Sequence, residues 1–161
     1  MTKLTDLHNR IHNMASNNAV QKKIFDILRN NSRILLTPQR NQLFYKSQDA
    51  DGKPLGFYTM HKDTAYHGTA EEFDREGQPF TMVDTGVFRR GIYQIVTSRA
   101  IYISSSAPHL EEMEANENNV FLSTKFFGIT DDNMKNRVKP AILKVLGPWM
   151  VNYMKGLPIV T

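Results

Sequence analysis

Cysteine is absent from the 161 residues, so the chain can form neither disulfides nor thiolate metal sites. Long apolar runs are absent too. None approaches the roughly 20 residues that a helix needs to span a bilayer, and we expect no membrane partner. The first ten residues, MTKLTDLHNR, lack the apolar core of a signal peptide. We therefore expect a protein that is made in the cytoplasm.

Concentrated positive charge is missing as well. The formal net charge is +4, but no run of Lys and Arg is longer than two residues. A nucleic-acid-binding protein usually gathers its basic residues on one face, whereas here they are scattered along the chain. The charge therefore favours general solubility. A small nucleic-acid-binding accessory protein remains an alternative, and it would use Lys22, Lys23, Arg89 and Arg90.

The composition suits one soluble globular domain over residues 1–161, because hydrophobic residues make up 40% and charged residues 22% of the chain. Apolar residues at spacings of three and four predict helix over residues 4–30. The ASNNA stretch favours turns, so we expect two helices or one bent helix. Thr37 and Pro38 predict the cap and the first residue of a short helix that ends near Tyr45.

The segments IYQIVTS and AIYISSS are rich in β-branched and aromatic residues, and they predict an antiparallel hairpin with Ser98-Arg99 in its turn. Alternation in the first strand places Ile92, Gln94 and Val96 on one face, and Tyr93, Ile95 and Thr97 on the other. Both faces carry apolar groups. We therefore expect both to be covered, by the long helix and by a partner.

The C-terminal part predicts a second main helix. Thr130 is a good N-cap, and the two aspartates after it suit the positive end of the helix dipole. Pro140 lacks a backbone donor and should kink this helix, and Gly147-Pro148 should break or bend it again. The last amphipathic piece either closes the core or forms an exposed patch that binds another subunit. It contains Trp149, Met150, Tyr153 and Met154.

Together these elements predict an α+β fold, with two main helices (N-terminal and C-terminal) packed on a small antiparallel β-sheet. Residues 46–83 are a long, poorly periodic loop or arm of the kind that tends to be functional. We expect it to be unordered before assembly, because it has few apolar anchors. Within it, DADGK predicts a turn with Gly52 at positive φ, since a calcium loop would need Glu in place of Met60. The acidic run in residues 111–117 predicts a solvated loop or, as an alternative, an acidic contact surface.

Asp84-Thr85-Gly86 follows apolar residues, as the catalytic loop of a retroviral-type aspartic protease does. Such an enzyme needs two carboxylates that share one proton, so a chain with one loop must dimerise. Phe126-Phe127-Gly128 superficially matches the element that supports this loop. However, bulky Val87 and Phe88 follow Gly86, and the hairpin lacks the glycines of a flexible flap.

We therefore favour a structural interpretation of this stretch and keep a dimeric aspartic protease as an alternative. In the structural interpretation, Asp84 or Thr85 caps a single helical turn. Gly91 ends that turn, and the hairpin follows it. Val87 and Phe88 would then be core residues.

His8 and His12 lie one helical turn apart, which is a metal-ligand spacing. No third ligand can be placed from the sequence, so we expect exposed histidines and no metal. His61, His67 and His109 lie in predicted loops without a nucleophile nearby, and no phosphate-binding glycine loop is present. We assign no catalytic residue, no cofactor and no metal, and expect that the chain is not an enzyme.

Three short motifs carry a resemblance to a known family. Asn41-Gln42-Leu43 precedes an Asp-x-x-Gly-Lys turn, Asp84-Thr85-Gly86 with Phe88 precedes the hairpin, and Phe127-Gly128-Ile129-Thr130-Asp131 opens the last helix. In this order, over about residues 40–140, they resemble tailed-phage head–tail joining or tail-completion (neck) proteins, related to phage virion-morphogenesis proteins. The chain departs from many relatives after Tyr102, where a glycine is missing, and at Pro140.

The resemblance implies a structural subunit in the neck or tail region of a virion, made in the cytoplasm of the host bacterium. It implies a ring of copies of the chain, commonly sixfold or twelvefold, between the portal or adaptor and the tail proteins. It implies no catalysis. A ring that passes DNA would also place some charge on its lumen, so passive contact with DNA is expected there.

Overall fold

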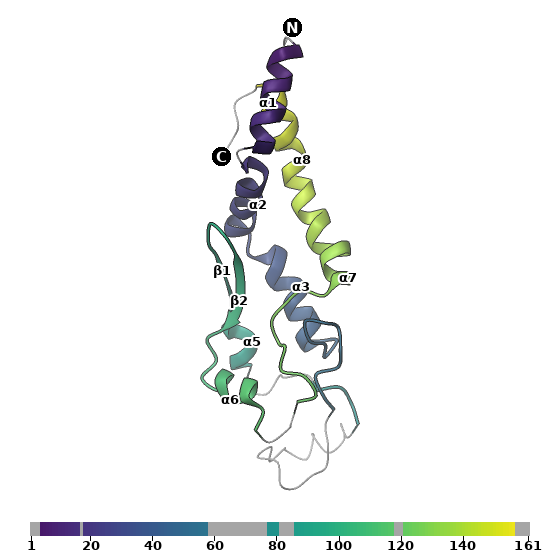
Figure 1. Ribbon diagram of the computed structural model, residues 1–161. Coiled ribbons are helices and arrows are strands. Elements are labelled where there is room, and N and C mark those ends of the chain that lie inside the picture. The colour runs from purple at the N-terminus through teal and green to yellow at the C-terminus, as the bar shows by residue number, and fades with distance from the viewer. Residues whose placement is uncertain (1–3, 17, 58–76, 81–85, 118–120, 157–161) are drawn as a thin grey trace.

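The structure is a computed structural model that describes residues 4–16, 18–57, 77–80, 86–117 and 121–156. It has the α+β fold expected from the sequence (Figure 1). Three helices follow one another along an elongated molecule, and they are α1 (Leu4–Ser16), α2 (Ala19–Asn30) and α3 (Arg33–Phe44). The C-terminal helix α8 (Lys139–Lys155) runs back beside α1 and α2.

The break in the N-terminal helical region falls where the ASNNA stretch predicted it. Asn18 takes a left-handed conformation with φ of 51° between α1 and α2, which an asparagine tolerates better than most residues. Of the two expected arrangements, the structure confirms two separate helices.

The prediction that Thr37 and Pro38 begin a helix is wrong. Helix α3 already begins at Arg33, and Pro38 lies inside it. The proline ring removes the N–H that would bond to the carbonyl oxygen of Ile34. The buried side chains that α3 supplies, from Ile34 to Phe44, outweigh that loss.

The predicted hairpin is confirmed. β1 (Ile92–Val96) and β2 (Ile101–Ser105) pair antiparallel, with Val96 opposite Ile101. The inner face packs on α2 and α3, and the Nε2 of Gln94 donates to the carbonyl oxygen of Leu28 at 2.6 Å. At the tip, the Thr97 hydroxyl accepts hydrogen bonds from the backbone N–H groups of Arg99 and Ala100, which closes the turn.

The C-terminal helix opens as predicted. The Thr130 side chain accepts a hydrogen bond from the backbone N–H of Asn133 and caps α7 (Asp131–Asn133). The π-helical segment η1 (Met134–Val138) follows, and it places a widened turn directly before Pro140. Gly147-Pro148 was expected to break or bend the helix, and it does not break it, because α8 continues through both residues to Lys155.

The acidic segment 111–117 is not the loop that we predicted. Helix α6 (Leu110–Ala115) occupies most of it. Leu110 and Met113 are three residues apart, so they share one side of a helix, and both pack against the core. This apolar pair gives the helix a surface to bury, while its glutamates are exposed as expected.

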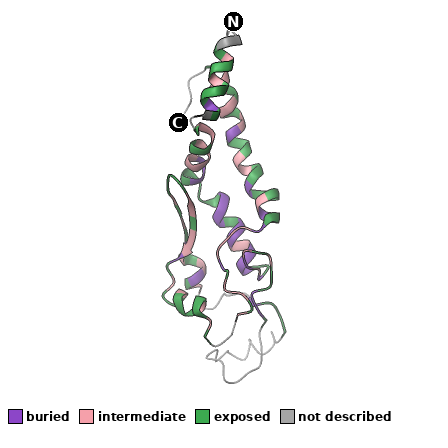
Figure 2. Ribbon diagram, viewed as in Figure 1, coloured by how far each residue is buried: buried purple, intermediate pink, exposed green. Residues whose placement is uncertain are grey.

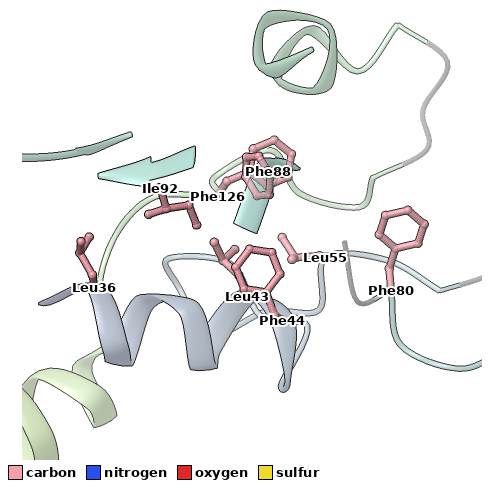
Figure 3. Close-up of a cluster of buried hydrophobic side chains, with 8 residues drawn as sticks. All are labelled: Leu36, Leu43, Phe44, Leu55, Phe80, Phe88, Ile92 and Phe126. Atoms are coloured by element: carbon pink, nitrogen blue, oxygen red, sulfur yellow. The ribbon is translucent and has the colours of Figure 1, made fainter. Parts of the chain in front are cut away.

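The buried apolar side chains of the described residues form two clusters, and α3, which is largely buried, contributes to both (Figure 2). Figure 3 shows the first cluster. The first consists of Leu36, Leu43, Phe44, Leu55, Phe80, Phe88, Ile92 and Phe126. The second consists of Ile27, Leu28, Ile34, Leu35, Val138 and Leu146. α3 therefore joins the helical end of the molecule to the end that carries the hairpin base and the loops.

The described parts of residues 46–83 hold two apolar anchors. Leu55 is fully buried and Phe80 nearly so, both in the first cluster. The backbone N–H of Phe80 donates to the carbonyl oxygen of Gly56 at 2.9 Å, which ties these two ends together. Residues 58–76, the middle of the expected arm, lie outside the described residues.

Candidate functional site

The structural interpretation of the Asp84 region is confirmed in part. Helix α5 (Val87–Gly91) is a single short helical segment, and β1 follows Gly91 directly. Its N-cap is Gly86, at φ 73°, whereas Asp84 and Thr85 lie outside the described residues. The expected cap by Asp84 or Thr85 therefore stays a prediction, and the left-handed conformation at the start of the helix falls on glycine, the residue that tolerates it best.

Of the two residues expected in the core after this loop, one is there. Phe88 is buried against Phe44, with ring centroids 5.9 Å apart, but Val87 is 42% exposed. Phe126, which superficially matched the supporting element of a protease loop, packs with its ring 6.2 Å from that of Phe88. The match is thus part of an aromatic core.

A buried polar network centres on one glutamine of α3. The fully buried Gln42 on α3 donates to the carbonyl oxygens of Asp49 (2.7 Å) and Gly128 (3.0 Å). Its Oε1 accepts from the backbone N–H of Thr130 (3.1 Å) and from the side chain of Asn133 (3.2 Å). All four hydrogen bonds that a glutamine amide can form are therefore made to the protein itself.

Gln39, one helical turn earlier, repeats the arrangement on the same loop. Its amide donates to the carbonyl oxygen of Phe126 at 2.8 Å and accepts from the N–H of Gly128 at 3.0 Å. Gln39 and Gln42 together fasten residues 126–130 along α3. The sequence pattern did not single out Gln39, although its spacing of three from Gln42 was a usable signal.

The DADGK turn joins the same network. Gly52 has a φ of 81°, as predicted. The buried Asp49 carboxylate accepts from the N–H groups of Asp51 (2.9 Å) and Lys53 (2.7 Å) and from the Ser123 hydroxyl (2.6 Å). These hydrogen bonds explain the Asp49 carboxylate as a group that stabilises the turn.

The histidine and basic candidates do not converge. His8 and His12 are exposed with stacked rings, and the described residues contain no group of three metal-ligating side chains. Lys22 and Lys23 lie on α2 beside the hairpin tip, whereas Arg89 and Arg90 lie on α5 at its base (Figure 1). The guanidinium of Arg89 donates to the Tyr45 hydroxyl at 2.8 Å.

Exposed apolar side chains gather on the outer face of the hairpin. Tyr93, Ile95 and Tyr102 are 40%, 48% and 57% exposed, and Ile95 lies directly opposite Tyr102 in the strand pairing. We call these three residues the outer hairpin face. Trp149 and Met150 of the predicted C-terminal patch instead pack, half-buried, against the second cluster, as the core interpretation expected.

A pocket with a volume of about 490 Å³ lies between α2 and the hairpin tip. Lys22, Phe25, Asp26, Arg29, Ser98 and Arg99 line it. Arg29 pairs with Asp26 at 2.6 Å. Lys22 and Arg99 are exposed and form no ion pair within the described part of the chain. We call this feature the α2–hairpin pocket, and it carries a surplus of positive charge.

None of the described helices is both long and apolar enough to cross a bilayer. Comparisons of the chain with protein-family models, with curated proteins and with solved structures found no match.

Proposed function

We propose that this chain is a structural subunit of a bacteriophage neck, or head–tail connector, which joins portal to tail by assembling with copies of itself into a ring. It acts by contact and carries out no reaction. The three motifs that resemble the phage neck family motivate this assignment. The structural observation that carries the proposal is a cluster of exposed apolar side chains.

That observation is the outer hairpin face. Large apolar side chains that cluster on a surface commonly mark a protein–protein interface. The hairpin is a two-stranded sheet whose inner face is already packed on α2 and α3. A second copy that covers Tyr93, Ile95 and Tyr102 would bury the apolar area that the fold leaves exposed.

The polar network supports the same function. Gln39, Gln42 and Asp49 are buried, and their side chains bond to backbone groups of the loops that flank α3. Buried side chains that are bonded as Gln42 is, at every donor and acceptor, help to fix one arrangement of the chain. A rigid subunit of fixed shape is what repeated contacts in a closed ring require.

Native mass spectrometry of the purified chain over a range of concentrations, alone and with the portal of its virion, tests the proposal. We expect a closed ring, of six or twelve copies, and expect Ile95→Asp to weaken its assembly. Leu122→Asp is the matched control, because Leu122 is also exposed but lies on a loop away from the hairpin. A chain that stays monomeric under every condition would contradict the proposal.

A further inference from the structure

The α2–hairpin pocket has the charge of a site for carboxylates. Three cationic side chains line it against one carboxylate, and that carboxylate is already paired with Arg29. Lys22 and Arg99 are left to meet an external anion. Arginine and lysine bond well to carboxylate oxygens. Phe25 adds an apolar wall, against which the methylene groups of an incoming acidic side chain can pack.

Helix α6 has the complementary charge. Glu111, Glu112 and Glu114 are exposed, while Leu110 and Met113 hold the other side of the helix against the first core cluster. Within the described residues, its glutamates form one ion-pair contact, of 3.3 Å between Glu112 and His109, and both side chains are exposed. α6 therefore presents an acidic, convex surface to solvent.

The two surfaces lie at opposite ends of the hairpin (Figure 1). The pocket is at the tip, and α6 follows the base of β2. Five-residue strands span about 17 Å, so α6 of one chain is too far from its own pocket to fill it. A contact between the two surfaces must therefore join different copies.

We propose that α6 of one copy docks in the α2–hairpin pocket of the next, with its glutamates facing Lys22, Arg29 and Arg99. This inference rests on the proposed function, because it names the contact through which the ring forms. The contact joins two different surfaces, so each copy keeps one of each free for a further neighbour, which is the condition for a ring. On each copy, the outer hairpin face lies between the pocket at the tip and α6 at the base. The charged contacts would therefore lie on either side of an apolar contact.

Cysteine cross-linking tests the contact directly, because the chain has no cysteine of its own. Ser98→Cys places a thiol in the pocket and Ala115→Cys places one on α6, and both positions are exposed and uncharged. In a mixture of the two variants, we expect mixed disulfide dimers in excess over dimers of either variant alone. Ala115→Cys mixed with Asn9→Cys, an exposed position on α1, is the matched control. Equal cross-linking in both mixtures would overturn the inference.

Charge exchange separates docking from a structural role. The double variant Lys22→Glu/Arg99→Glu should weaken self-association on the order of tenfold, since like charges would then face each other across the contact. Adding Glu112→Lys and Glu114→Lys to the same chain should restore it. Restoration would be unexpected if the reversed charges had only damaged the fold.

The outcomes also distinguish this inference from the proposed function. If the charge-reversed double variant still forms rings as well as the unchanged chain, the inference fails and the ring proposal stands. If the unchanged chain forms no assembly with or without the portal, both fail. If the reversal instead abolishes binding of a duplex DNA fragment and leaves assembly intact, the pocket is a nucleic-acid site and the docking of α6 is wrong.

Discussion

The Nε2 atom of Gln42 donates a hydrogen bond to the carbonyl oxygen of Gly128, 3.0 Å away and 86 residues further along the chain. The same side chain bonds to Asp49 and to Thr130. Two of the three motifs on which the proposed function rests, the Gln-Leu step with its Asp-x-x-Gly-Lys turn and the Phe-Gly-Ile-Thr-Asp entry to the last helix, therefore meet at one buried amide. Their residue types have a structural explanation that does not depend on catalysis.

Replacing Gln42 by Leu should destabilise the protein by about 3 kcal/mol, because buried donors and acceptors would lose their partners. The affected groups include the carbonyl oxygens of Asp49 and Gly128 and the N–H of Thr130. Urea denaturation followed by circular dichroism measures the change. The same substitution at the exposed Gln21 is the control, and we expect it to stay within about 0.5 kcal/mol of the unchanged chain. Equal effects of the two substitutions would show that the network contributes nothing.

Gly91→Ala should also be costly. A methyl group there would lie 2.8 Å from the Ser105 hydroxyl oxygen, 3.1 Å from that of Ser106 and 3.2 Å from the backbone nitrogen of Ala107. We expect a loss of about 1–3 kcal/mol, as for other overpacked sites.

A double-mutant cycle shows whether this crowding is the cause. Ser105→Ala removes the atom closest to the new methyl group, so adding it to Gly91→Ala should recover part of the lost stability. Strictly additive losses, measured by the same urea denaturation, would place the cost of Gly91→Ala elsewhere.

The elements that the sequence predicted correctly depend on local chemistry. Thr130 caps its helix through a bond to a residue three positions away, and strand alternation assigns Tyr93 and Ile95 to one face without any tertiary information. The residues of the outer hairpin face could therefore be predicted from alternation alone.

The features that the sequence did not predict depend on distant partners. α3 includes Pro38 because the many buried side chains of this helix outweigh one missing hydrogen bond. α6 forms because Leu110 and Met113 pack against the core. The α2–hairpin pocket combines Lys22 with Arg99, which are far apart in sequence and brought together only by the packing of the hairpin on α2. Propensity and spacing contain no information on such contacts.

The exposed ion pair between Asp51 and Lys125, 2.7 Å apart, should give a small pH dependence. The hydrogen bond and charge of Lys125 hold the pKa of Asp51 below its ordinary value of 3.8. A lowered pKa in the folded state means that the ionised pair stabilises the protein above pH 3.8, and that this contribution is lost as pH falls through the folded pKa.

A titration of the Asp51 carboxyl by NMR checks this sign. In Lys125→Met, the pKa of Asp51 should rise towards its ordinary value, and added salt should weaken the shift in the unchanged chain. The difference in stability between the unchanged chain and Asp51→Asn should shrink below pH 3.8. A pKa of Asp51 that is the same with and without Lys125 would refute the pairing.

Asp84→Asn separates the structural proposal from the protease alternative. An aspartic protease loses its activity when its shared carboxylates become amides, because no proton can be exchanged between them. Under our proposal, Asp84→Asn should leave ring formation unchanged in native mass spectrometry, whereas Ile95→Asp should weaken it. Incubation of both variants and the unchanged chain with a peptide library, followed by mass spectrometry, provides the second measurement. Peptide cleavage by the unchanged chain that disappears only in Asp84→Asn would establish the enzyme and refute the purely structural subunit.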